Sequence, residues 1–413
     1  MLRTIKVLRI VALLGAIPLL GSCGGDDRCF NCGYAPEVVY PSEASLGLVA
    51  GNFNGNGHTS IIGTSTVLYN PSGNTGYLKS YLSSGVGTFA APVLTADGND
   101  PLYLASADLD GDGLPDVVSA SYADGALEVF LNSTGSPGSF KVPVMLTSPG
   151  ASQLAIGDMN NDGLPDLVSA DFNVSLFVQT SPGVFAAPVS LYSGGANWVA
   201  VGDLNHDGIA DVALTDASGV KVLLHTGAAS ASTYAAPIPV FTQTANANLA
   251  GANVIAIADV NGDGFDDLII TDPGPTGGTA PTVSVLLQNA ASPGTFLAAV
   301  SYAIAPQSLV QAILITDVNG DGRPDIVIGG SNAVSVLLQD TTAAGTFLAA
   351  SNYVVSNANE VAVADVNGDG LPDIIIATGA TQPLVNGIYA NTPGVLLQNA
   401  SSPGTFAALV NLP

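Results

Sequence analysis

The chain has 413 residues, a formal net charge of -25 at pH 7 and an isoelectric point near 4.1. An acid excess of this size repels the phosphates of nucleic acids and the headgroups of anionic membranes, so neither is an expected partner. The length would allow two or three ordinary domains, but an internal repeat favours one large repeat domain.

The first 22 residues have the order of a bacterial secretion signal. A basic start at 1–9 is followed by an apolar run at 10–20, which is too short to span a bilayer. The segment Leu20-Gly21-Ser22-Cys23 resembles the bacterial lipobox. The resemblance implies that signal peptide 1–22 is removed and that Cys23 carries lipid. An ordinary signal peptide with a nearby cysteine is the alternative.

Residues 23–45 are expected to form a flexible tether between the lipid and a folded domain at 46–413, because this stretch is polar and contains prolines. Cys29 and Cys32 lie within it as a Cys-x-x-Cys pair. In an exported chain such a pair favours a small disulfide loop over a redox or zinc site, since zinc would need two further ligands and none is near.

Seven nine-residue loops recur between residues 52 and 373, each with oxygen-bearing side chains at positions 1, 3, 5 and 9 and glycine at position 6. This spacing is that of a shortened EF-hand-like calcium loop. In six loops these positions hold carboxylates and amides: Asp108, Asp110, Asp112 and Asp116; Asp158, Asn160, Asp162 and Asp166; Asp203, Asn205, Asp207 and Asp211; Asp259, Asn261, Asp263 and Asp267; Asp317, Asn319, Asp321 and Asp325; Asp365, Asn367, Asp369 and Asp373.

The number of copies decides between two interpretations of these loops. A single copy could be a plain Asp-Gly hairpin turn with solvated acids. Six copies that keep carboxylates at positions 1, 5 and 9 favour metal binding, and we expect about six bound calcium ions, one per acidic loop. The first loop carries no carboxylate and is expected to be weak or empty; its ligand positions are Asn52, Asn54, Asn56 and Ser60.

Short apolar runs flank each loop, as at 361–364 and 374–377, and predict two strands joined by the loop as a hairpin. A third strand follows, as at 334–338, and a recurring aromatic is expected on a fourth; these aromatics are Phe89, Phe140, Phe185, Tyr234, Phe296, Phe347 and Phe406. Successive loops start 45 to 58 residues apart. The pattern predicts an all-β fold, a seven-bladed β-propeller of four-stranded antiparallel blades with calcium loops between first and second strands.

The unit at 361–376, followed by Val-Leu-Leu-Gln-Asn at 395–399 and Gly-Thr-Phe at 404–406, resembles the FG-GAP and VCBS repeats. These repeats are similar to the blades of the integrin α-subunit propeller, and the resemblance covers roughly residues 46–413. It implies a calcium-stabilised, commonly extracellular propeller used for adhesion or ligand binding, in some members with carbohydrate contact. Carried over by position, the seventh loop would bind calcium through its four ligand side chains and the Leu371 carbonyl.

Catalytic patterns are missing from the sequence. The repeat frame does not cluster His58, His206 and His225, and no G-x-S-x-G elbow, P-loop or dinucleotide fingerprint occurs. The residues five before the loop starts are diverse, and four of them predict a ligand rim on the face opposite the calcium hairpins: Tyr103, Gln153, Trp198 and Glu360. The alternative is that these side chains fill the central channel.

These inferences predict a non-enzymatic, lipid-anchored, monomeric propeller that presents loops to a protein or a glycan. The membrane would be reached only through the N-terminal lipid, with the outer membrane or cell surface favoured. A lectin-like propeller, a polysaccharide lyase or hydrolase, and an envelope spacer are the alternatives. The scarcity of basic residues outside the signal argues against the enzyme; they are Arg28, Lys79, Lys141, Lys221 and Arg323.

Overall fold

The computed structural model describes residues 47–67, 75–99, 101–170, 172–226, 233–242, 254–272, 281–306, 310–378 and 393–411. The predicted signal peptide, the tether, Cys23, Cys29 and Cys32 lie outside these ranges. All the regular elements in the described ranges are β-strands. Within them, no helix has the length and apolar character needed to cross a membrane.

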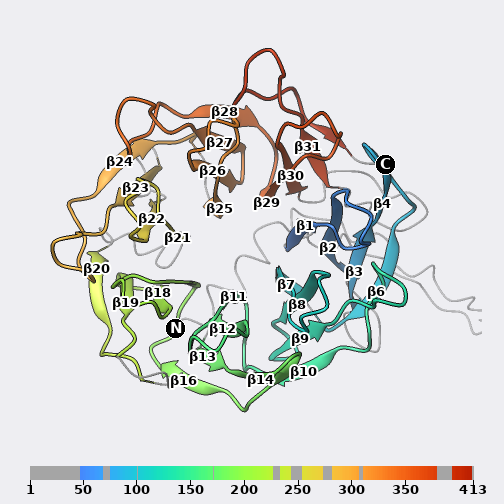
Figure 1. Ribbon diagram of the computed structural model, residues 1–413, viewed down its shortest axis with the longest axis horizontal. Coiled ribbons are helices and arrows are strands. Elements are labelled where there is room, and N and C mark those ends of the chain that lie inside the picture. Colours follow the sequence, from blue (N-terminus) through green and yellow to red (C-terminus); the bar gives the residue numbers. More distant parts are fainter. Residues whose placement is uncertain are drawn as a thin grey trace, which may run out of the picture. The chain divides into compact units, whose positions relative to one another are not determined.

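The strands form seven four-stranded antiparallel sheets, one for each repeat, and strands that follow one another in the chain are neighbours in the sheet (Figure 1). The first three sheets are β1 (Leu48–Gly51), β2 (Ser60–Val67), β3 (Thr75–Tyr81) and β6 (Val93–Asp97); β7 (Pro101–Ala107), β8 (Asp116–Ser121), β9 (Ala126–Phe130) and β10 (Val144–Thr147); β11 (Gln153–Gly157), β12 (Asp166–Ala170), β13 (Val174–Phe177) and β16 (Val189–Tyr192).

The fourth and fifth sheets are β17 (Trp198–Gly202), β18 (Asp211–Asp216), β19 (Gly219–Leu223) and β20 (Ile238–Thr242); β21 (Ile255–Ala258), β22 (Asp267–Asp272), β23 (Thr282–Leu286) and β24 (Val300–Ala303). The last two are β25 (Val310–Thr316), β26 (Asp325–Gly330), β27 (Ala333–Leu337) and β28 (Ser351–Val354); β29 (Ala358–Ala364), β30 (Asp373–Thr378), β31 (Gly394–Leu396) and β32 (Val410–Asn411). Two-stranded ribbons join β4 (Ser83–Gly85) to β5 (Thr88–Phe89) and β14 (Gln179–Ser181) to β15 (Val184–Phe185).

The first strands of the sheets lie innermost, and each contacts the first strand of the next sheet around the ring. The ring closes where β1 contacts β29. The first sheet is built only from N-terminal strands and the last only from C-terminal strands, so no strand of the described ranges crosses this seam. The predicted seven-bladed propeller of four-stranded antiparallel blades is confirmed.

The hydrophobic core is divided among the seven interfaces between neighbouring blades. Each of seven clusters of buried side chains takes its members from two adjacent sheets. Successive residues of a second strand serve both sides, since Ile61 packs against the seventh blade and Ile62 against the second. A blade therefore has no core of its own and depends on its neighbours, as expected for a repeat architecture.

The prediction for the recurring aromatic residues was wrong. All of them come before the fourth strands. Phe89 lies in β5 and Phe185 in β15, and each of the other five forms an isolated β-bridge with the second residue after the third strand of its blade. Phe347 and Phe406 turn inward and are largely buried, and their backbone N–H groups donate to the hydroxyls of Tyr302 and Tyr353 in the preceding blade, each over 3.1 Å. The true fourth strands are exposed outer strands, so an aromatic gains more burial at the blade interface.

Candidate metal centre

The acidic loops join the first and second strands of their blades, as predicted, and their glycines fix the backbone. In the second loop Gly111 and Gly113 have φ values of 74° and 87°, in the left-handed region that side chains disfavour. A Cβ on Gly113 would meet no atom within 4 Å, so the backbone conformation alone favours glycine there. Asn161 and His206 adopt the conformation of Gly111 in their own loops, with φ of 57° and 59°.

The position-1 carboxylate closes each turn by accepting backbone N–H groups. Asp108 Oδ1 accepts from Gly111 and Asp112 over 2.8 and 3.1 Å, and Oδ2 accepts from Gly113 over 2.9 Å. The position-5 carboxylate holds the end of the turn, since Leu114 N–H donates to Asp112 Oδ1 over 2.9 Å. The loop is therefore pre-shaped by its own aspartates.

The position-9 aspartate is fully buried and connects three strands. In the sixth loop Asp325 Oδ2 accepts from the Val318 N–H over 3.0 Å, and Oδ1 accepts from the Gln339 N–H, beyond the third strand, over 2.8 Å. All six acidic loops have the same pair of hydrogen bonds, made by Asp116, Asp166, Asp211, Asp267, Asp325 and Asp373. Sequence reasoning assigned this residue only to metal binding and missed its structural role.

Burial makes these aspartates difficult to ionise. Burial raises the pKa of Asp116, Asp166 and Asp325 to about 6 and that of Asp211 and Asp267 to about 7. The two backbone N–H groups oppose the rise, and the other aspartates of the same loop add to it. A nearby cation would favour the ionised form and lower these pKa values.

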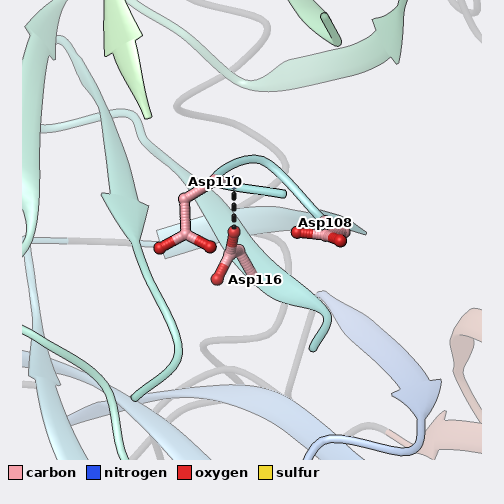
Figure 2. A group of neighbouring side chains, drawn as sticks. All are labelled: Asp108, Asp110 and Asp116. Carbon is pink, nitrogen blue, oxygen red and sulfur yellow. Dashed lines mark hydrogen bonds between the residues drawn. The ribbon is translucent and has the colours of Figure 1, made fainter. Parts of the chain in front are cut away.

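The second loop brings three carboxylates together. Asp108, Asp110 and Asp116 each offer an oxygen, and these oxygens lie within 4.8 Å of one another (Figure 2). Asp110 Oδ1 is buried and has no hydrogen-bond partner. Such an all-oxygen set with an unpaired carboxylate oxygen fits a hard cation such as calcium. Among the described loops, this is the one in which three carboxylates converge so closely.

At the four ligand positions the second loop has one more carboxylate than the other acidic loops, because Asp110 stands where they have asparagine. Lys141 Nζ lies 2.9 Å from Asp110 Oδ2 and offsets the extra carboxylate. In the third, fifth, sixth and seventh loops the position-3 amide instead donates to the position-5 carboxylate, over 2.9 to 3.2 Å. The predicted ligands of each acidic loop thus lie on one turn.

The first loop is closed by neutral hydrogen bonds. The Nδ2 groups of Asn54 and Asn56 donate to the Ser83 carbonyl over 2.7 and 2.9 Å, and Ser60 Oγ accepts from the Ser83 N–H over 3.0 Å. The ligand positions of this loop hold no carboxylate and offer a cation only neutral oxygens. Weak or absent metal binding by the first loop stays a prediction.

The loops are also tied to the next blade by an amide side chain that sequence reasoning did not identify. Gln398 Nε2 donates to the Val318 carbonyl in the preceding blade's loop over 2.6 Å and to its own blade's Pro372 carbonyl over 2.7 Å. Asn132, Gln179 and Gln339 make the same contact across their interfaces. The recurring Leu-Leu-Gln after the third strand was the available signal.

The four predicted rim residues lie at or near the starts of their inner strands. Tyr103 and Trp198, from the second and fourth blades, are in edge-to-face contact with ring centres 5.8 Å apart. Burial, and then the Glu360 carboxylate of the seventh blade, raise the pKa of Tyr103. Gln153 and Glu360 are each 8% exposed. Contact between non-adjacent blades favours the alternative, in which these side chains fill the central space.

The histidines lie in different surroundings. His206 packs on Phe265, with ring centres 4.2 Å apart, and His225 packs edge-to-face on Tyr234 at 5.4 Å. His58 lines a cavity of about 150 Å³ between the first loop and the seventh, together with Asp365.

The FG-GAP-like repeat matches five segments that together cover more than half of the chain: 52–119, 108–169, 158–214, 203–270 and 317–376. An Agrocybe aegerita lectin, whose structure concerns recognition of non-reducing terminal N-acetylglucosamine, is 19% identical, with 76% of this chain and 80% of the lectin covered and a TM-score of 0.51.

A protein from Lactobacillus plantarum is 14% identical, with 86% of this chain and 96% of that protein covered and a TM-score of 0.52. At these identities the likeness concerns the fold alone. No curated protein matches the chain. The repeat matches cover most of the acidic loops and their flanking strands. The chain therefore belongs to the FG-GAP-like repeat family.

Proposed function

We propose that the protein is a calcium-braced, non-enzymatic recognition propeller, carried to the bacterial envelope and anchored there by lipid on Cys23. The observation that supports the calcium is the second loop, where Asp108, Asp110 and Asp116 converge and Asp110 Oδ1 has no partner. The other five acidic loops have the same backbone frame and the same position-9 hydrogen bonds.

In each acidic loop the side chains at positions 1, 3, 5 and 9 would hold the ion, with water completing the shell. Calcium, when bound, supplies positive charge that offsets repulsion between carboxylates confined to one turn. The chain transmits this effect outward, because the position-9 aspartate joins three strands and the amide contact joins the loop to the next blade. Ions at the second, fifth and sixth loops would thus brace an interface between blades as well as a hairpin.

Recognition is the use that best fits such a scaffold. A rigid, repeated frame is suited to presenting variable loops, and loops on such frames commonly carry the binding residues. A lectin shares the fold, which supports a glycan as one ligand class beside a protein. We assign no reaction to the chain, because the paired carboxylates of the repeated loops stand at metal-ligand spacing.

Metal analysis and thermal unfolding test the calcium. We expect about six ions in the loops, and removing them should lower the melting temperature by roughly 10 °C or more, since each ion stabilises only the folded chain. A melting temperature indifferent to calcium removal would contradict the bracing role.

Binding assays test recognition separately. The purified chain should bind glycans or proteins on arrays in calcium without releasing products. The release of unsaturated or new reducing sugar ends from a polysaccharide would show an enzyme instead. Binding on neither the glycan array nor the protein array would favour an envelope spacer.

A further inference from the structure

A small cavity lies at the seam between the first and seventh blades, and we call it the seam cavity. Its volume is about 150 Å³, and its walls come from the first loop, from the turn between β4 and β5 and from the seventh loop. Its lining includes His58, Thr59, Ser83, Val86, Asp365 and Gly368. Val86 and Gly368 are exposed, so the cavity reaches the surface of the protein.

The seam cavity lies where two other blades bring a large side chain against the preceding loop. Position 7 of the acidic loops is apolar in five of six cases; the residues are Leu114, Leu164, Ile209, Phe265, Arg323 and Leu371. Phe265 stacks on His206, which holds position 4 of the loop before it. Leu114 approaches Gly55 in the same way, since a Cβ built on that glycine would lie 3.4 Å from Leu114 Cδ2. Position 7 closes both of these interfaces.

At the seam this closing position is polar. His58 holds position 7 of the first loop, and it lines the cavity together with Gly368, which holds position 4 of the seventh loop. Thr59 follows at position 8, where four of the acidic loops have proline. Val86 packs so closely on Gly368 that a Cβ there would come within 2.1 Å of Val86 Cγ1. The seam therefore has a polar cavity, and the close contact at Gly368 fixes one of its walls.

The lining offers both hydrogen-bond donors and acceptors. His58 is held through its backbone N–H, which donates to Asn56 Oδ1 over 2.9 Å, and its imidazole has no hydrogen-bond partner within the described ranges. A neutral imidazole has one donor and one acceptor nitrogen. The two oxygens of Asp365 accept from the N–H groups of Gly368 and Gly370 over 2.6 and 2.9 Å, and each oxygen keeps a further lone pair.

The size and polarity of the cavity select one class of ligand. A cavity of about this volume holds a single six-membered ring, whereas drug-sized ligands need about 300–1,000 Å³. The polar lining disfavours an apolar ring, and the Asp365 carboxylate disfavours an anion. An ammonium group only donates hydrogen bonds, but a hydroxyl both donates and accepts, as the lining requires. A neutral ring with several hydroxyls fits these conditions.

We infer that the seam cavity binds the terminal pyranose ring of a neutral glycan. Sugar hydroxyls would donate to the Asp365 carboxylate and exchange hydrogen bonds with the His58 imidazole and the Thr59 hydroxyl, while Val86 would contact the apolar C–H groups of the ring. This ligand class rests on the recognition function proposed above. The site would be unique to the seam, because it depends on residues that only the first loop carries at positions 7 and 8.

A glycan array at saturating calcium, followed by calorimetric titration of the oligosaccharide that binds best, tests the site. His58→Leu introduces the residue that Leu114, Leu164 and Leu371 supply at position 7, so the fold should be kept while the cavity loses its imidazole. We expect its dissociation constant to rise about tenfold or more. His206→Gly is the matched control, because it likewise replaces a loop histidine by the commonest residue at its position, outside the cavity; its affinity should equal that of the wild type.

Competition and a second variant complete the test. The free monosaccharide that corresponds to the terminal ring should displace the oligosaccharide, and failure to compete would overturn a site for a single ring. Thr59→Phe fills the cavity and leaves His58 in place, so it should also weaken binding even if His58→Leu does not fold. Wild-type affinity in both variants would refute the site.

Failure of the site is distinguishable from failure of the proposed function. Binding to proteins but to no glycan would keep the recognition propeller and refute the glycan site at the seam. Binding on neither array would overturn both.

Discussion

At the scale of single residues, the position-9 aspartate combines two tasks with different requirements. As a hydrogen-bond acceptor it holds two backbone N–H groups, one in its own loop and one just beyond the third strand, and as a ligand it must stay ionised although burial raises its pKa. These tasks can be separated by substitution, because asparagine keeps one acceptor oxygen and loses the charge.

We predict that Asp325→Asn destabilises the calcium-free chain by about 1–3 kcal/mol, since one buried backbone N–H loses its acceptor. Asp321→Asn in the same loop is the control. Its carboxylate is exposed, and asparagine occupies the same loop position in the first loop at Asn56, so the cost without calcium should be within about 0.5 kcal/mol.

Denaturant unfolding with and without calcium measures both variants. With calcium both should lose stability relative to the wild type, because each removes a ligand. Equal costs without calcium would mean that position 9 has no structural role beyond metal binding.

At the scale of elements, the amide after the third strand links four of the blades to the loop before them. Gln398→Leu would leave the Val318 and Pro372 carbonyls without their donor, at an expected cost of about 2–4 kcal/mol. Gln288→Leu is the matched control, because Gln288 Nε2 donates to one carbonyl, that of Asp266 in its own blade. Its cost in denaturant unfolding should be about half as large, and equal costs would argue against an inter-blade contribution.

The strands differ in how well the sequence alone predicts them. The second and third strands are predictable because neighbouring blades bury both faces, which leaves nearly continuous apolar runs such as Asp373–Thr378. The fourth strands are short and exposed, with Leu94 at 58% and Val300 at 50%, so they carry no such signal and the nearby aromatics were mistaken for them.

For the candidate site, the sequence predicts the ligands within each loop but not the contacts between blades. The fixed spacing of oxygen ligands located every loop, because all ligands come from one turn. The contact of Tyr103 with Trp198 depends on how the blades are placed around the ring, which spacing within one repeat does not encode.

At the scale of the whole molecule, the seam between the first and seventh blades rests on side-chain packing. Leu48, Ile61 and Tyr81 pack on Ile375 and Val395, and no strand is exchanged between the two sheets. The first loop, without carboxylates, and the cavity beside Asp365 lie at this same seam. Calcium at the seventh loop would therefore brace the interface that has the least support from chain connectivity.

The pH dependence of the free energy of unfolding should differ between the calcium-free and the calcium-bound chain. Five of the six position-9 aspartates have folded pKa values of about 6 to 7 against an ordinary value of 3.8, so the folded chain binds more protons between these limits than the unfolded chain does. The free energy of unfolding of the calcium-free chain must then fall as pH rises through this window. Calcium competes with these protons for the aspartate oxygens, so its stabilising effect on the folded chain should be larger at the higher pH.

We predict that the metal-stripped chain melts at a higher temperature near about pH 5 than near about pH 8, whereas saturating calcium removes or reverses the difference. Calorimetry at several pH values, with and without calcium, measures it, and the first-loop blade offers a control. Because Ser60 replaces the position-9 aspartate there, Asp373→Ser should shrink the pH effect in the metal-stripped chain, as it removes one titrating group. A metal-stripped wild type that is more stable near pH 8 would mean that the buried aspartates are compensated by the protein itself, and the loops would then have no need of a cation.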